Sequence, residues 1–139
     1  MKAVQLFLLF VISGLNIQAQ TNTDAIIGEW LTQSKDGKIL IYKQGTKYFG
    51  KIIGGNSEGR KDTNNPDEKL RNQPLIGKVI LNNFVFDGKS KWEEGTIYDP
   101  NNGKTYSCVI KLKSNNEMEV RGYVGISLFG RTDMWTRIK

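Results

Sequence analysis

The sequence predicts an all-β protein: an eight-stranded antiparallel up-and-down barrel with one short helix in the loop between the third and fourth strands. Turn-forming pairs such as Asp-Gly and Asn-Gly recur along the chain, and they favour two-residue hairpins. The segments between them are rich in β-branched and aromatic residues, which are typical of strands. Because most connections are short, a closed barrel is favoured over a β-sandwich, which is the alternative and needs longer crossovers.

Each strand is bounded by turn signals. These are Asp36-Gly37, Gly45, Asp87-Gly88, Asn102-Gly103 and Asn115-Asn116, where glycine and asparagine tolerate the positive φ angles of tight turns. The predicted strands span residues 26–33, 38–43, 47–53, 78–86, 92–98, 104–112, 118–124 and 132–138.

Several of these segments alternate between apolar and polar residues. In 104–112, one face carries Tyr106, Cys108, Ile110 and Leu112. In 118–124, one face carries Met118, Val120 and Val124, and the other carries Glu119 and Arg121. One apolar face packed on the core and one polar face toward solvent are typical of antiparallel sheet. Closing the sheet on itself removes its exposed edges.

The N-terminus has the features of a secretory signal peptide. Lys2 precedes an apolar run over residues 6–12, and Ala19 is a small residue suited to cleavage. The run is too short to span a bilayer, so an uncleaved anchor is the weaker alternative. We therefore expect a signal peptide over residues 1–19, a single barrel domain over 20–139, and a periplasmic or secreted protein with no transmembrane segment after cleavage.

Charge and cysteine content narrow the possible partners. Cys108 is the only cysteine, so no intrachain disulfide can form, and we expect it to be a buried apolar residue. The net charge of +6 favours anionic partners such as phospholipid headgroups or acidic polysaccharide. The basic residues are scattered among acidic ones, which argues against nucleic acid.

The longest connection, residues 54–77, is polar and contains two prolines. Asn65 suits a helix N-cap, Pro66 suits the first helical position, and Arg71 suits the last turn. The sequence therefore predicts a short helix over 66–72. A long connection on a barrel with short turns is typical of a lid or a plug over one end.

Catalytic and metal chemistry are poorly supported. The chain has no histidine, which removes the commonest general base and metal ligand, and Cys108 therefore has no histidine to activate it. A carboxylate pair drawn from Asp62, Asp67 and Asp99 remains an alternative. The Asx residues of DTNNPD (Asp62, Asn64 and Asp67) and of DPNNG (Asp99 and Asn101) also resemble a calcium loop, but their spacing is better explained by caps and turns. We expect no enzyme activity, cofactor or metal.

A ligand cavity inside the barrel is the remaining chemical possibility. By alternation, Trp92, Glu94, Thr96 and Tyr98 are predicted to share one face, which suits a partly polar lumen. These aromatic residues could instead fill a solid core. The candidate ligand-binding residues are Trp92, Tyr98, Tyr106, Arg71, Arg121 and Arg131.

Four segments carry a family resemblance. The tripeptide Gly28-Glu29-Trp30 at the first strand resembles the signature of calycins, the lipocalin-like barrels. That resemblance implies that Trp30 closes one barrel end beneath an arginine of the last strand, here Arg137 or alternatively Arg131. Together, GEW, KDTNNPDEKLRNQPLIG, KWEEGTIYDPNNGKTY and RGYVGISLFGRTDMWTR resemble the bacterial secreted family DUF2147. This family implies a calycin-like barrel and no established activity.

Two functional hypotheses follow. The first is an exported, non-enzymatic barrel that binds a small, partly apolar or amphipathic ligand in its lumen, with residues 54–77 as the lid. The alternative is a cell-envelope interaction protein with a filled barrel, whose basic outer surface recognises a protein or an anionic polymer. Under the alternative, Arg60, Arg71, Arg121 and Arg131 are expected to gather in one external patch.

Overall fold

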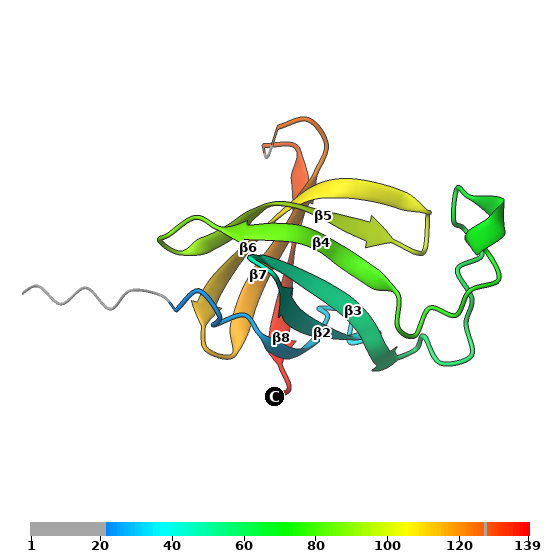
Figure 1. The fold of residues 1–139 in the computed structure, drawn as a ribbon, viewed down its shortest axis with the longest axis horizontal. Helices are drawn as coiled ribbons and strands as arrows, with labels where there is room; N and C mark the ends of the chain where they lie inside the picture. Colours follow the sequence, from blue (N-terminus) through cyan, green and yellow to red (C-terminus); the bar gives the residue numbers. More distant parts are fainter. Residues whose placement is uncertain (1–21, 127) are drawn as a thin grey trace, which may run out of the picture.

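A computed structural model describes residues 22–126 and 128–139 as a closed barrel of eight antiparallel strands (Figure 1). The predicted signal peptide, 1–19, lies outside the described residues. The strands are β1 (Gly28–Leu31), β2 (Gly37–Gln44), β3 (Lys47–Gly55), β4 (Val79–Phe86), β5 (Lys91–Asp99), β6 (Lys104–Ser114), β7 (Glu117–Tyr123) and β8 (Gly130–Arg137), with the short 3-10 helix η1 (Glu68–Leu70) between β3 and β4.

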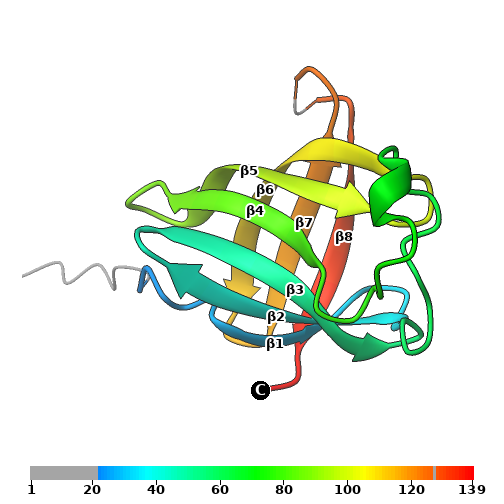
Figure 2. The same ribbon diagram turned by 45° about the vertical axis from the view of Figure 1, so that its right-hand side comes forward.

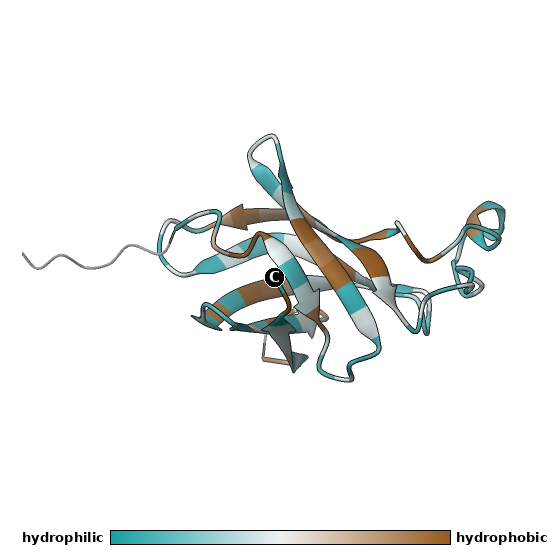
Figure 3. Cartoon of the chain, turned by 90° about the horizontal axis from the view of Figure 1, so that it is seen from below, coloured by the Kyte–Doolittle hydropathy of each residue, from teal (hydrophilic) through white to brown (hydrophobic). Residues whose placement is uncertain are grey.

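Closure occurs between the first and last strands. Trp30 of β1 pairs with Arg137 of β8, and Leu31 pairs with Thr136, while the other edge of β1 pairs with β2. Every strand therefore has two hydrogen-bonded neighbours, and the sheet has no free edge. The predicted barrel is confirmed. Along the strands, hydrophobic and hydrophilic residues alternate as bands (Figure 3), which places one face in the core.

The first strand is shorter than the predicted 26–33. Residues 22–27 form consecutive turns, in which Ala25 N donates to Asn22 O and Ile27 N donates to Asp24 O. The strand begins only at Gly28, whose φ of 145° few other residues adopt. This N-terminal segment, residues 22–27, lies across one end of the barrel, and Ile26 within it is fully buried.

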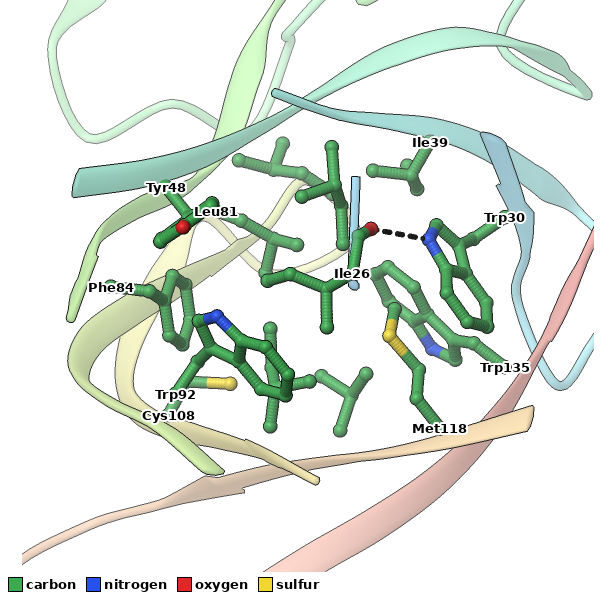
Figure 4. Close-up of a cluster of buried hydrophobic side chains, with 14 of the residues drawn as sticks. Ile26, Trp30, Ile39, Tyr48, Leu81, Phe84, Trp92, Cys108, Met118 and Trp135 are labelled. Carbon is green, nitrogen blue, oxygen red and sulfur yellow. Dashed lines mark hydrogen bonds between the residues drawn. The ribbon is translucent and has the colours of Figure 1, made fainter. Parts of the chain in front are cut away.

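We call the end of the barrel that the N-terminal segment covers the closed end. Bulky aromatic side chains fill the barrel there. The indole of Trp30 donates to Ile26 O over 2.9 Å, and the indole of Trp92 donates to Thr23 O over 3.0 Å. The hydroxyl of Tyr48 donates to the Asp24 carboxylate over 2.5 Å. Figure 4 shows these rings around Ile26. Side chains therefore fill this end of the lumen.

The predicted face of Trp92, Glu94, Thr96 and Tyr98 is wrong, because strand β5 contains a bulge. The pairing of β5 with β6 shifts register between Trp92 and Gly95, and Glu94 has a φ of 64°. The extra residue breaks the alternation. Glu94 is exposed and Gly95 faces the core, where a Cβ would lie 2.5 Å from the ring of Phe84. The large Phe84 ring occupies the space that a side chain at Gly95 would need.

The alternation of the seventh strand also ends earlier than predicted. Met118 and Val120 are buried as expected, but β7 ends at Tyr123. Val124, predicted on the buried face, is 69% exposed because it already belongs to the connection to β8.

The helix predicted over 66–72 is reduced to η1, a single 3-10 turn. Its N-cap is Asp67, whose carboxylate accepts from Lys69 N over 3.0 Å. Asn65 does not cap the helix. Instead, its side-chain oxygen accepts from Asp67 N over 2.8 Å across Pro66, which is an Asx turn. The local hydrogen bonds of Asn65 therefore delay the start of the helix by two residues.

The whole connection between β3 and β4, residues 56–78, forms a two-legged strap. Its legs are joined by an isolated bridge between Lys61 and Pro74 and by a bond from Leu75 N to Arg60 O. At its tip, the Asn64 amide donates to the carbonyls of Pro100 and Asn101 in the β5–β6 connection. Figure 2 shows η1 beside this connection. Within the part of the chain described, no helix is long and apolar enough to cross a membrane.

Candidate functional site

A cavity of about 620 Å³ opens at the end of the barrel opposite the N-terminal segment. In an up-and-down barrel alternate connections lie at the same end, so this open end is ringed by four of them: β1–β2, the strap, β5–β6 and β7–β8. The rings of Trp30, Tyr48 and Trp92 gather at the closed end, where they bond to the N-terminal segment. Small residues such as Gly122 of β7 stand at the open end instead, and a cavity remains there.

The inner wall of the cavity is apolar. It is lined by buried side chains from five strands and from the strap: Ile39, Ile52, Leu75, Ile80, Val120 and Trp135. Leu75 is only 1% exposed although it belongs to the strap. The strap therefore contributes part of the apolar wall.

The rim of the cavity is polar and carries both signs of charge. Arg60 of the strap and Arg131 of β8 supply the positive charges, and Asp36, Asp99 and Asp133 supply the negative ones. Three of these charged groups have partners at the rim: Arg131 Nε donates to Asp133 over 3.2 Å, and the Asn56 amide donates to Asp36 over 3.1 Å. An apolar interior beneath a polar rim suits a molecule with an apolar body and a polar end.

Trp135 has the one buried side-chain nitrogen or oxygen atom without a hydrogen-bond partner in the described part of the chain. The residue lines the cavity and is 3% exposed. In Figure 4 its ring lies near the ring of Trp30 and the side chain of Met118. An unsatisfied buried donor costs about 1–3 kcal/mol, so a ligand with a hydrogen-bond acceptor would gain by reaching it.

A buried polar cluster anchors the strap next to the cavity. The Asp62 carboxylate is fully buried and accepts from the Tyr98 hydroxyl over 2.7 Å and from the Asn65 amide over 2.7 Å. Its charged partner is Lys78, whose Nζ lies 3.0 Å from Asp62 and 4.8 Å from the centre of the Tyr98 ring. The cluster joins both legs of the strap to strand β5.

These contacts shift two pKa values. Burial alone would raise the pKa of Asp62, but hydrogen bonds from Tyr98 and Asn65, together with Lys78, lower it below the ordinary 3.8. Burial, followed by the hydrogen bond to Asp62, raises the pKa of Tyr98 to about 12. Asp62 is therefore ionised and Tyr98 is neutral at physiological pH.

Three of the six predicted binding residues line the cavity: Tyr98, Tyr106 and Arg131. Trp92 lies elsewhere, at the closed end, fully buried and bonded to Thr23. Arg71 folds back on the strap, where its Nε donates to Asn65 O over 2.7 Å. Arg121 lies near the β7–β8 connection, with bonds to the Thr132 hydroxyl and the Leu128 carbonyl.

Sequence reasoning missed Trp135, Arg60 and Leu75 as cavity residues. Alternation could have placed Trp135, because it pairs with Met118, which was predicted on the buried face. Arg60 and Leu75 carry no such signal, since the strap has no periodic pattern and its fold depends on the Asp62 cluster.

The described residues offer little for catalysis. Burial raises the pKa of the Cys108 thiol to about 12, so the reactive thiolate is rare at neutral pH. Asp62, one member of the possible carboxylate pairs, is bonded to Tyr98, Asn65 and Lys78. Among residues 22–126 and 128–139, no three acidic or cysteine side chains gather as a metal site would require.

Comparisons with known proteins place this geometry among related folds. The model of a family described as "Uncharacterized protein conserved in bacteria", DUF2147, matches residues 28–137. A similar solved structure is protein HP1028 from the human pathogen Helicobacter pylori, described as belonging to the lipocalin family. It has a TM-score of 0.74 and 26% sequence identity, over 81% of this chain and 82% of that chain. No curated protein matches the sequence significantly.

Proposed function

The chain belongs to the DUF2147 family and has a lipocalin-like barrel, and from this premise we propose that it is an exported, non-enzymatic binding protein. Its ligand is a small molecule with an apolar body and a polar end that carries a hydrogen-bond acceptor. The ligand occupies the cavity at the open end of the barrel.

The cavity itself is the observation that supports this proposal. Its volume of about 620 Å³ lies within the range of small-molecule sites, roughly 300–1,000 Å³. Ile39, Ile52 and Val120 supply a dry surface for the apolar body. Arg60 and Arg131 stand at the rim, where they can meet the polar end of a ligand.

Two observations favour binding over catalysis, one in the cavity and one in the core. A general acid or base works best when its pKa lies near the operating pH. The pKa of Tyr98 is raised to about 12, and its hydroxyl already donates a hydrogen bond to Asp62. The Cys108 thiol is buried in the core.

Native mass spectrometry of the protein purified from its native host under non-denaturing conditions tests the proposal directly. We expect a bound species of defined mass that is released on unfolding. The extracted molecule is then returned to the unliganded protein in a titration followed by tryptophan fluorescence, since Trp135 lines the cavity.

Filling the cavity provides a matched pair of variants. At Gly122 a Cβ would meet its nearest neighbours at 3.4 Å and 3.6 Å, which are ordinary contacts, so a Cβ is accommodated at this cavity-lining position. Gly122→Leu should abolish ligand binding while the protein stays folded. Ser107→Leu adds the same side chain at an exposed position on β6 and should bind normally. Equal binding by both variants would place the ligand outside the cavity.

Export is tested separately. Cell fractionation and the mass of the mature N-terminus should find the protein outside the cytoplasm, cleaved after Ala19. A full-length cytoplasmic protein would remove export from the proposal and leave cavity binding to be judged on the ligand experiments.

A further inference from the structure

The connection between β7 and β8 carries an unusual concentration of exposed apolar side chains. Val124, Ile126, Leu128 and Phe129 are 69%, 58%, 75% and 72% exposed. The other large apolar residues on the described surface, Ile27, Ile76 and Ile138, are only 36–41% exposed. We call the four side chains the apolar tip. A cluster of this kind on a soluble surface marks an interaction site more often than chance exposure.

The apolar tip projects from the open end of the barrel. Figures 1 and 2 show the connection rising beyond the strands, away from η1 and from the C-terminus. A turn shapes it, since Phe129 N donates to Ile126 O over 3.1 Å. Val124 and Phe129 also line the cavity. The apolar tip is therefore continuous with the cavity mouth.

Positive charge stands just behind the apolar tip. Arg131 is the second residue of β8, and its side chain is 85% exposed with Asp133 3.2 Å away. Arg121 lies on β7, and its guanidinium donates to Leu128 O and to the Thr132 hydroxyl. Apolar side chains in front and cations behind are the arrangement of an element that lies in a membrane interface.

We propose that the apolar tip docks the protein on a membrane surface that contains anionic phospholipid. Leu128 and Phe129 enter the acyl boundary, and Arg121 and Arg131 meet the headgroup phosphates. Removal of Lys2 with the signal peptide leaves 19 basic and 14 acidic residues, a net charge of +5 that attracts the mature protein to such a surface at longer range.

A lipid surface suits the apolar tip better than a protein partner does. A stable protein interface buries about 800 Å² on each side and is built on a broad face. Here the apolar residues stand on one narrow connection that projects alone (Figure 1). Docking through the apolar tip also turns the cavity mouth toward the lipid. The docking itself does not depend on whether the cavity holds a ligand.

Vesicle co-sedimentation tests the proposal with the full mature chain. Vesicles of phosphatidylcholine with phosphatidylglycerol should bind the protein, and binding should weaken with added salt because the charge contacts are screened. The double variant Leu128→Ser/Phe129→Ser should weaken binding at least about tenfold, since it removes two large apolar groups from the lipid. Ile27→Ser/Ile138→Ser makes the same changes at the closed end and should bind normally.

A second arm separates the apolar and charged contributions. Arg131→Gln should lower binding to the anionic vesicles while leaving the weaker binding to pure phosphatidylcholine unchanged. Melting curves establish that each variant is folded, which is expected because Leu128, Phe129 and Arg131 are exposed.

Two outcomes would overturn the proposal. One is a vesicle assay that fails, either because the wild-type protein does not bind even at low salt or because the Leu128→Ser/Phe129→Ser variant binds as tightly as the wild type. The other is a dimer in analytical ultracentrifugation that this variant dissolves, which would assign the apolar tip to a second copy of the chain.

Discussion

The hydroxyl of Tyr98 donates a 2.7 Å hydrogen bond to the carboxylate of Asp62, 36 residues earlier in the chain. Asp62 belongs to the strap and Tyr98 belongs to β5, so this bond joins the longest connection to the barrel wall. The Asp62 side chain is fully buried and carries a charge that Lys78 balances. A buried charge is stable only while its partners remain in place, so the cluster holds the strap in one position.

Removing the Tyr98 hydroxyl should destabilise the protein. Tyr98→Phe leaves the buried Asp62 carboxylate with one partner fewer, and we expect the free energy of unfolding to fall by about 1–3 kcal/mol. Urea denaturation measures this change. Tyr106→Phe is the matched control, because the Tyr106 hydroxyl only accepts a bond from Asn102 at an exposed site. Equal losses in the two variants would contradict a structural role for the Asp62 cluster.

Acid should weaken the protein partly through Asp62. The pKa of Asp62 is lowered in the folded state, because the bonds from Tyr98, Asn65 and Lys78 outweigh its burial. Because the pKa of Asp62 is lower in the folded state than in the unfolded state, the folded state binds fewer protons at pH values between the two. Asp62 therefore contributes stability above its ordinary value of 3.8, and this contribution is lost as pH falls through the folded pKa.

The comparison of wild type with Asp62→Asn isolates this effect. Denaturation at a series of pH values from about 6 to about 2 should show a steeper fall for wild type than for the variant. A decline will remain in the variant, since the hydrogen bond from Tyr48 lowers the pKa of Asp24 as well. Parallel curves for the two proteins would exclude Asp62 as a source of acid sensitivity.

Replacing Arg137, at the closed end, should lower the stability of the protein. Its guanidinium lies 4.3 Å from the centre of the Trp30 ring and donates to the carbonyls of Ile27, Ala25 and Asn115. Arg137→Lys keeps the charge but cannot reach three carbonyls in different directions. We expect a loss of about 1.5–3 kcal/mol in thermal or urea denaturation. Arg60→Lys, at an exposed rim position, should be close to neutral.

Alternation and turn chemistry predicted the strands and their closure because both features are local. The cation over Trp30 was predicted from the family resemblance, with Arg137 favoured over Arg131. By contrast, glycine is needed at position 95, beside the bulge, because of the ring of Phe84, a residue on the neighbouring strand. A period of two carries no information about such a contact.

Alternation in the sequence also does not predict how far along the barrel axis a side chain lies. Alternation placed Trp92 inside the barrel, where it lies, but gave no indication that it stands at the closed end beneath Thr23. Sequence reasoning did not predict the burial of Asp62, because a polar residue near Asn65 and Pro66 is typical of an exposed loop. Only the position of Lys78 and Tyr98 around it explains how the carboxylate is accommodated.

The bulge offers its own test. At Gly95 a Cβ would lie 2.5 Å from the ring of Phe84, which is closer than real contacts allow. Gly95→Ala should therefore cost about 1–3 kcal/mol through overpacking. Phe84→Leu alone should also cost stability, by removing buried atoms. The double variant should be more stable than the sum of the two losses predicts, because the smaller side chain relieves the clash. Additive losses in urea denaturation would mean that Phe84 is not the obstacle.

The unpaired indole of Trp135 leads to a last comparison. Trp92 and Trp135 are both at least 97% buried, but only the Trp92 nitrogen has a hydrogen bond, to Thr23 O over 3.0 Å. Changing either residue to phenylalanine removes a similar volume, so the packing losses should be similar. Trp92→Phe also loses a hydrogen bond, whereas Trp135→Phe removes an unsatisfied donor. In the unliganded protein we expect Trp135→Phe to be the milder change by at least about 1 kcal/mol. If the two losses are equal, the Trp135 nitrogen has a partner of its own in solution, such as an ordered water.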